Sequence, residues 1–326
     1  MHRFRLGLDA LAAVSFACSP LQEAVLSLQM WTRPGRHPHQ RPWFEPMRPA
    51  FERLDGTLLR SLVADNGYVP DFLTPRPAVP FPDVRAELAE VRALPPGELA
   101  GQLARTFAPG RRPVPSPLAE GLADPARLLA RIADALEEYW ELCLHPAWWP
   151  RARSVLHADL VHRSRVLAER GAAAVFRDLD GRLHWDEGVL TISRGCRHGE
   201  VDVEVGGRGL VFLPTCFARG AISSISDRHP PAITYPARGQ ATLGGACRPP
   251  APPRALEQLV GGPKARLLTL LAEPCSTTEL ARRLGVTPGA VSQHLAVLSA
   301  TRLVTRARHG RAVLYARSPL GDQLCR

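Results

Sequence analysis

The sequence lacks the cysteine pairs and the long apolar runs that mark secreted and membrane-spanning proteins. Its seven cysteines are scattered and form no C-x-x-C pair, which argues against the disulfide framework of a small secreted domain. No run of about 18 apolar residues occurs, so we expect no transmembrane helix. The apolar stretch after Arg5 contains Asp9 and leads to no clear cleavage site. We therefore expect no signal peptide and a cytoplasmic protein.

The motifs of common nucleotide-binding and hydrolytic enzymes are absent as well. The chain contains no Walker glycine loop, no G-x-G-x-x-G and no G-x-S-x-G. His157 and His162 would lie about 140° apart on a helix and would not converge on a metal. Cys196 and His198 offer two ligands where a zinc site needs three or four. We therefore expect no enzymatic activity, no catalytic residues, no cofactor and no bound metal.

Lysine is nearly missing, because Lys264 is the only one among 41 basic residues. The formal net charge is +10, and it is unevenly distributed. Residues 251–326 contain eleven basic and four acidic residues, a balance of +7, whereas the other 250 residues carry 30 basic and 27 acidic groups, a balance of +3. A concentrated positive charge at one end indicates a small polyanion-binding domain attached to a larger, nearly neutral one.

Proline, by contrast, is abundant, with 32 in 326 residues, so long uninterrupted helices cannot fill the chain. The length favours two domains, and the prolines of residues 249–253 predict a stiff linker between them. Apolar residues have helical spacing at 8–30, 48–65, 84–107 and 125–170. Short β-type runs bounded by glycine turns follow at 174–176, 183–185, 189–192, 201–205 and 210–213. We expect residues 1–248 to be mainly helical over 1–170 and antiparallel β-rich over 171–248.

The basic segment 254–326 contains the signals of two helices joined by a tight turn. Ser276 followed by Glu279 fits a capping box that begins a helix, and Gly285 suits the left-handed residue that ends one. Thr287 followed by Pro288 then begins a second helix. Helix, glycine turn and helix is the layout of a helix-turn-helix.

The second helix carries an apolar stripe and an opposite polar face. At 100° per residue, Val291, Leu295 and Leu298 share one side, and the other side carries small or polar uncharged residues, namely Gly289, Ser292, Gln293 and Ala296. Such a face can lie against base edges, and a glutamine can bond adenine through two hydrogen bonds. His294 lies beside the apolar stripe. The candidate base-reading residues are Gly289, Ser292, Gln293 and His294, although for His294 core packing or a phosphate contact is the alternative that its position favours.

A basic β-hairpin is predicted directly after this helix. Two alternating runs, 303–308 and 311–316, flank the tip His309-Gly310. A basic hairpin behind a recognition helix is typical of a wing that contacts the DNA backbone, and the alternative is a solvated charged hairpin. The candidate backbone-contacting residues are Thr287, Arg283, Arg306, Arg308, His309 and Arg311.

Residues 278–298, TELARRLGVTPGAVSQHLAVL, together with the hairpin resemble the DNA-binding core of the ArsR-type winged helix-turn-helix regulators. The resemblance covers about residues 256–318. It implies a homodimer that binds an inverted-repeat operator in double-stranded DNA, usually as a repressor. By position it places Ser292, Gln293 and His294 in the recognition helix and residues 308–311 in the wing.

Two parts of the chain depart from a typical ArsR-type regulator. Metal-sensing members carry a C-x-C pair before the recognition helix, but residues 276–278 are Ser, Thr and Thr here, so we expect no metal sensing at that place. The large N-terminal region, from Phe16 to Glu23 and on through Trp31 and Trp43, resembles the opening of an uncharacterised N-terminal domain found on actinobacterial ArsR-type regulators. That resemblance supplies no ligand.

The sequence therefore predicts an α+β protein with a large helical N-terminal region, an antiparallel β-rich segment and a C-terminal winged helix-turn-helix. The expected function is a DNA-binding transcription regulator, with residues 1–248 serving in dimerisation or in sensing an unknown small-molecule effector. Trp140, Trp148 and Trp149 either pack in the core or line an apolar effector pocket. The alternative function is a winged-helix protein-interaction module on an enzyme or scaffold, with residues 1–248 as the active part.

Overall fold

The computed structural model describes residues 1–38, 40–64, 67–107, 113–193, 200–226, 229–244, 253–272, 275–309 and 312–325. The chain divides into two compact units, Met1–Ala246 and Cys247–Arg326. The expected linker at 249–253 lies outside the described residues apart from Pro253, which begins a helix, and so do Cys196 and His198. In the part of the chain that is described, no helix is long and apolar enough to cross a membrane.

The larger unit contains a helical part built around one apolar core. Several of its helices begin at a side chain that caps the first turn, as where Ser19 accepts a hydrogen bond from Gln22 N and Asp55 accepts one from Leu58 N. The helices are α2 (Pro20–Ser27), α3 (Gln29–Thr32), α4 (Arg41–Phe51), α5 (Gly56–Ser61), α6 (Val84–Arg92), α7 (Pro96–Phe107), α8 (Ser116–Gly121) and α9 (Pro125–Tyr139), with the 3-10 turns η1 (Pro34–Arg36) and η2 (Asp71–Leu73).

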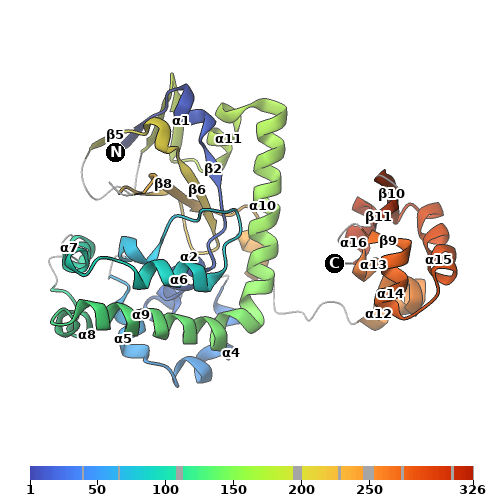
Figure 1. The fold of residues 1–326 in the computed structure, drawn as a ribbon, viewed down its shortest axis with the longest axis horizontal. Helices are drawn as coiled ribbons and strands as arrows, with labels where there is room; N and C mark the ends of the chain where they lie inside the picture. Colours follow the sequence, from blue (N-terminus) through green and yellow to red (C-terminus); the bar gives the residue numbers. More distant parts are fainter. Residues whose placement is uncertain are drawn as a thin grey trace. The chain divides into compact units, whose positions relative to one another are not determined.

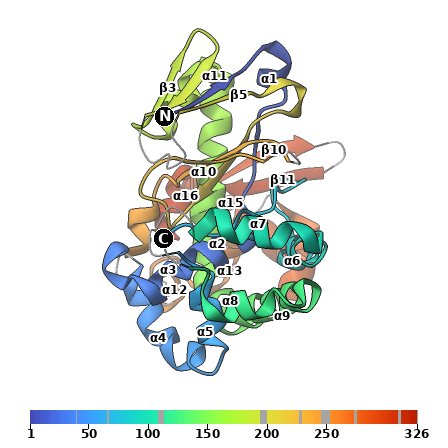
Figure 2. The ribbon, with the colours of Figure 1, turned by 90° about the vertical axis from the view of Figure 1, so that its left-hand side faces the viewer.

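Among its described residues, this unit also contains two four-stranded sheets. The first has the order β3–β4–β1–β5, from β3 (Leu183–Asp186), β4 (Val189–Ile192), β1 (His2–Arg5) and β5 (Val201–Glu204). The second has the order β2–β6–β8–β7, from β2 (Ser15–Phe16), β6 (Val211–Thr215), β8 (Ala232–Pro236) and β7 (Ile222–Ser224). Within this unit the strands lie at one end and helices α4 to α9 at the other, and α10 (Trp149–Arg170) runs along both (Figure 1, Figure 2). The short helix α1 (Leu8–Ala12) and the 3-10 turns η5 (Gly206–Arg208) and η6 (Gln240–Gly244) also belong to this unit.

The expected fold class is confirmed, because helical and strand-rich parts follow one another as predicted. The direction of the strands differs from the expectation, however. Strand β1 pairs in parallel with β5, and β6 pairs in parallel with both β2 and β8. The sheets are therefore mixed rather than purely antiparallel. The N-terminal strands β1 and β2 account for two of these parallel pairs, and the third joins β6 and β8 within the segment that was expected to be antiparallel.

The strand predicted at 174–176 is wrong, since these residues belong to helix α11 (Ala172–Leu179). Three successive alanines begin the helix, and alanine has the highest helix propensity. Val175, Phe176 and Leu179 are buried along one side. The local preference for a helix and its apolar stripe therefore outweigh the β propensity of Val175 and Phe176.

The helical spacing over 125–170 corresponds to α9, a π-helical segment (Trp140–Trp148) and α10. Trp148 is fully buried, with ring centroids 5.3 to 6.1 Å from those of Trp43, Phe44 and Phe217, so it packs in the core. Trp140 and Trp149 lie 5.1 Å apart, centroid to centroid, and line a cavity of about 400 Å³. The lining of this cavity also includes Asp83, Arg85, Glu141 and Arg153, and Trp140 is buried in the core as well. Core packing thus holds for Trp140 and Trp148, and an apolar effector pocket stays a prediction.

The smaller unit consists of helices around a three-stranded sheet of order β10–β11–β9. Its elements are α12 (Pro253–Val260), α13 (Gly262–Leu270), β9 (Cys275–Ser276), α14 (Thr277–Leu284), α15 (Pro288–Ala300), β10 (Val304–His309), β11 (Ala312–Arg317) and α16 (Pro319–Leu324). A separate apolar core joins α13, α14, α15 and the start of β10. This unit has the helix-turn-helix and hairpin that the sequence predicts.

Candidate nucleic-acid interface

Helices α14 and α15 begin and end at the residues that local chemistry selects. Ser276 Oγ accepts a hydrogen bond from Glu279 N at 3.3 Å, and Gly285 ends α14 in the left-handed conformation with φ 66°. Thr287 Oγ1 accepts from Ala290 N at 3.3 Å, and Pro288 is the first residue of α15. The turn between the two helices is therefore short and defined at both ends.

One side of α15 is anchored in the core of the smaller unit. Val291, Leu295 and Leu298 are each 1% exposed and pack against residues of α13 and α14. Burying three such side chains contributes several kcal/mol to folding, at about 1.5–3 kcal/mol each. The opposite face of the helix is thereby held toward solvent.

That opposite face has the character expected of a base-reading surface. Ser292, Gln293 and Ala296 are exposed, and no atom lies within 4 Å of a Cβ built at Gly289. The face is uncharged and has little bulk near its N-terminal end, so a nucleic-acid groove can approach the backbone closely. His294 is only partly exposed, in keeping with its position beside the apolar stripe.

The basic residues around α15 differ in their surroundings. Arg306 on β10 is exposed. Arg283 is exposed too, but its Nη2 donates to Glu279 Oε1 at 2.6 Å, so a phosphate would compete with that carboxylate. The backbones of Arg308 and His309 pair with Val313 and Ala312 in the hairpin. The side chains of Arg308 and His309, and the whole of Arg311, lie outside the described residues.

The wing is joined to the helix-turn-helix by a third strand that the sequence analysis did not foresee. Strand β9 pairs with β11 in the register Cys275 to Tyr315 and Ser276 to Leu314. Ser276 also caps α14, so the same residue fixes both the hairpin and the first helix of the motif. The orientation of the wing relative to α14 is therefore set by backbone hydrogen bonds.

Two further exposed arginines belong to this surface and were missed from the sequence. Arg282 lies on α14 beside Arg283. Arg302 is exposed between α15 and β10 in the left-handed region, with φ 57°, and its carbonyl accepts from Ser318 Oγ at 2.6 Å. Only their positions in the sequence could have identified them, because Arg282 lies near the end of α14 and Arg302 comes just after α15.

The described residues contain no group of three or more His, Cys, Asp or Glu side chains that could hold a metal ion. Cys275 in β9 is buried. The described part of α14, α15 and the wing presents neutral polar side chains and exposed arginines.

The family match of the smaller unit agrees with this geometry. Residues 265–312, from α13 to the tip of the hairpin, match the MarR family. The solved structure of reduced HlyU from Vibrio cholerae N16961 is 25% identical over 22% of this chain and 81% of HlyU, with a TM-score of 0.20. No curated protein matches the chain. The smaller unit thus carries a winged helix-turn-helix domain similar to that of the MarR family, a domain type of DNA-binding transcription regulators.

Proposed function

We propose that this chain is a transcription regulator that binds double-stranded DNA as a homodimer, at an inverted-repeat operator and as a repressor. The observation that supports the proposal best is the exposed, uncharged face of α15, with Ser292 and Gln293 turned away from the core stripe. The resemblance of residues 278–298 to the ArsR-type regulators supports the same mode of binding. In this proposal residues 1–248 have no enzymatic role and serve in sensing or dimerisation.

In the proposed complex, α15 lies in the major groove. Gln293 bonds an adenine edge, Ser292 donates to or accepts from a neighbouring base, and Gly289 permits close approach of the helix. His294, half-buried at the border of this face, contacts a base or a phosphate at its edge. A two-fold dimer presents two such helices about one turn of DNA apart, which accounts for an operator with inverted symmetry.

Arginine supplies the sequence-independent part of the binding. Arg306 and Arg302 are exposed beside α15, and in this proposal Arg308, His309 and Arg311 add further contacts to the DNA backbone. Thr287 caps α15, and its hydroxyl can donate a hydrogen bond to a phosphate. Arg283 gives up its ion pair with Glu279 and binds a phosphate in its place. If each subunit neutralises about four phosphates, log K falls with log salt concentration with a slope near −7 per dimer.

The test is selection of bound sequences from random DNA, followed by affinity measurements on the selected site and on unrelated DNA. Gln293→Ala should lose about 1–3 kcal/mol on the selected site only. Arg306→Ala should weaken binding to every sequence and make the salt slope shallower by about 1 per subunit. Arg177→Ala, which removes an exposed arginine from α11, is the charge-matched control and should change neither quantity.

Two results would contradict the proposal. If no sequence is enriched from random DNA, the winged helix does not select an operator, and a protein-interaction role takes precedence. If Gln293→Ala and Arg306→Ala weaken cognate and unrelated DNA alike, the division between base-reading and backbone-contacting residues is wrong.

A further inference from the structure

The larger unit contains a cavity of about 540 Å³ whose charged lining is mostly positive. Three arginines line it, Arg36, Arg182 and Arg219, and Asp71 is the one carboxylate among its lining residues. Its size is within the range of small-molecule sites, about 300–1,000 Å³. The three arginines are far apart in the sequence, and only the folded chain brings their positive charges around the same cavity.

A buried amide nitrogen in this lining lacks a hydrogen-bond partner among the described residues. Gln22 is 1% exposed, and its Oε1 accepts from Thr234 Oγ1 at 3.2 Å. Its Nε2 has no hydrogen-bond partner among the described residues. A buried donor that is left unsatisfied is costly, so Gln22 is suited to a ligand that brings an acceptor to this wall.

The positive field of the cavity also acts on His37. This imidazole is buried in the lining, where burial, followed by the charges of Arg36 and Arg219, lowers its pKa to about 4. Its Nε2 lies 3.5 Å from Gln29 Oε1. His37 is therefore uncharged near pH 7 and adds a neutral polar group, while the arginines supply the charge.

The remaining lining includes apolar side chains. Leu26, Val69, Phe217 and Ile222 face the same cavity. A purely inorganic anion would leave this apolar surface uncovered, whereas an organic anion covers it with an apolar body. We propose that the cavity binds a small organic anion, with its acidic group held by Arg36, Arg182, Arg219 and the Gln22 amide, and its apolar body placed against Leu26 and Phe217.

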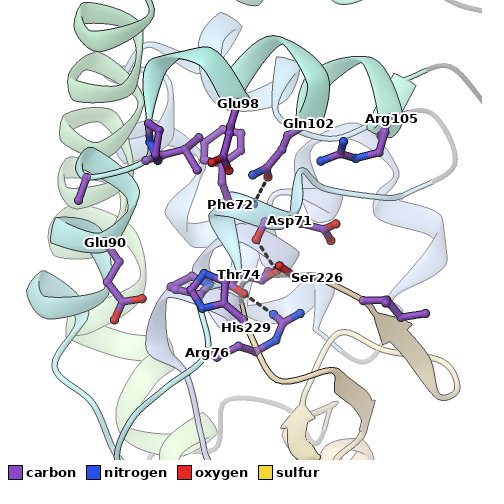
Figure 3. A pocket seen from close by; sticks show the side chains of 15 residues that line it. Asp71, Phe72, Thr74, Arg76, Glu90, Glu98, Gln102, Arg105, Ser226 and His229 are labelled. Carbon is purple, nitrogen blue, oxygen red and sulfur yellow. Dashed lines mark hydrogen bonds between the residues drawn. The ribbon is translucent and has the colours of Figure 1, made fainter. Parts of the chain in front are cut away.

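A neighbouring cavity of about 520 Å³ differs from the proposed site in the charge of its lining (Figure 3). Its lining contains Asp71, Glu90 and Glu98 as well as Arg76 and Arg105, so its acidic and basic side chains nearly balance. Arg76 there already donates to the carbonyls of Thr74, Ser224 and Pro230 at 2.6 to 3.3 Å. This second cavity therefore gives no preference for an anion and supplies a matched control.

One glycine allows the position of a guanidinium group to be tested separately from its charge. A Cβ at Gly220 would overlap the guanidinium of Arg182, and the backbone of Gly220 is not in the left-handed region. Gly220→Ala therefore keeps every charge and requires no positive φ, but it displaces the end of a flexible side chain. An anion site that depends on Arg182 must respond to this change.

The experiment is a fluorescence titration of the full chain with 8-anilinonaphthalene-1-sulfonate and with N-phenyl-1-naphthylamine, its neutral counterpart without the sulfonate. We expect one saturable site per chain for the anionic probe. Arg182→Ala and Arg219→Ala should each weaken it about tenfold or more, as loss of a hydrogen bond to a charged group predicts. Gly220→Ala should weaken it in the same direction, and Arg105→Ala, in the neighbouring cavity, should not.

The neutral probe should bind all five proteins with affinities within about twofold of one another, since it makes no ionic contact. Equal affinities of the two probes, or an anionic probe that binds Arg182→Ala and Arg219→Ala as tightly as the unmodified chain, would overturn the proposal. Unfolding curves followed by tryptophan fluorescence show whether each variant is folded. The assignment of the anion as an effector rests on the proposed regulator function, but the titration contains no DNA, so the two proposals fail separately.

Discussion

Glu23→Gln tests how the buried polar groups of the larger unit control its stability. Glu23 on α2 is fully buried, where it accepts hydrogen bonds from Thr215 Oγ1 and from Cys216 N, the latter at 3.0 Å. Burial raises its pKa from the ordinary 4.5 to about 7, against the opposing effect of those two hydrogen bonds. Its Oε2 has no partner among the described residues.

The sign and size of the effect follow from this pKa. Because the folded state holds the proton more tightly than the unfolded state, the contribution is fully present below pH 4.5 and is lost as the pH rises through 7. The gap between the two pKa values corresponds to about 3 kcal/mol in total, of which about 2–3 kcal/mol is lost between pH 5 and 8. In Glu23→Gln the side-chain oxygen can still accept from Cys216 N, but the amide does not titrate in this pH range.

The assay is urea unfolding at pH 5, 6.5 and 8, followed by tryptophan fluorescence. All six tryptophans, from Trp31 to Trp185, belong to the larger unit, so the signal reports on this unit alone. The difference in unfolding free energy between Glu23→Gln and the unmodified chain should shift by about 2–3 kcal/mol in favour of the variant from pH 5 to 8. Glu138→Gln, which neutralises an exposed carboxylate, is the control. Parallel pH profiles for Glu23→Gln and the unmodified chain would refute the reasoning.

Three further predictions concern the smaller unit, which contains no tryptophan and is followed by amide hydrogen exchange. Thr287→Ala removes the side-chain cap of α15 and should lower the protection of that helix by about 1 kcal/mol; unchanged exchange would show that the cap contributes nothing. Leu295→Ala, in the core stripe, should destabilise the unit by about 2–5 kcal/mol, and a loss below 1 kcal/mol would mean that the stripe is not tightly packed. Gly289→Leu adds bulk where a Cβ meets no neighbouring side chain or distant backbone within 4 Å and replaces glycine by a better helix former, so it should not lower the protection of α15 but should weaken selected-site DNA binding about tenfold or more; undiminished affinity would place this face away from the DNA.

The smaller unit was predictable because its signals are local. The caps at Ser276 and Thr287, the turn at Gly285 and the stripe from Val291 to Leu298 each depend on residues within a few positions of one another. The hairpin likewise pairs neighbouring runs, from Val304 with Arg317 to His309 with Ala312. The third strand β9 escaped prediction because two residues are too few to show an alternating pattern.

The larger unit was predictable only in class, because its strand pairing is non-local. His2 pairs with Val201 and Ile192, and Ser15 pairs with Val211, across nearly 200 residues. Glycine turn signals identify hairpins between neighbouring strands, and they give no information on such partners. The spacing over 8–30 predicted helix throughout, yet β2 lies at Ser15–Phe16, where its pairing with β6 outweighs local preference.

The cavity proposed for an organic anion escaped sequence analysis for the same reason. Gln22, Arg36, Arg182 and Arg219 show no spacing that connects them, and each resembles an ordinary polar residue when taken by itself. The tryptophans that suggested an effector pocket were conspicuous by their size, but Trp148 fills the core. Residue type alone predicted which side chains would be buried. Only the folded structure shows which charged side chains line the same cavity.

The buried carboxylate and the cavity belong to the same junction within the larger unit. Glu23 follows Gln22 on α2, and its partners Thr215 and Cys216 immediately precede the 217–220 wall of the cavity. The hydrogen bonds of Glu23 therefore hold one wall of the cavity against the helix that supplies its unpartnered amide. Because glutamine retains the acceptor for Cys216 N, Glu23→Gln should preserve anion binding while it flattens the pH profile. Glu23→Ala removes that acceptor and frees the wall, so it should weaken the anionic probe even though no cavity arginine has changed.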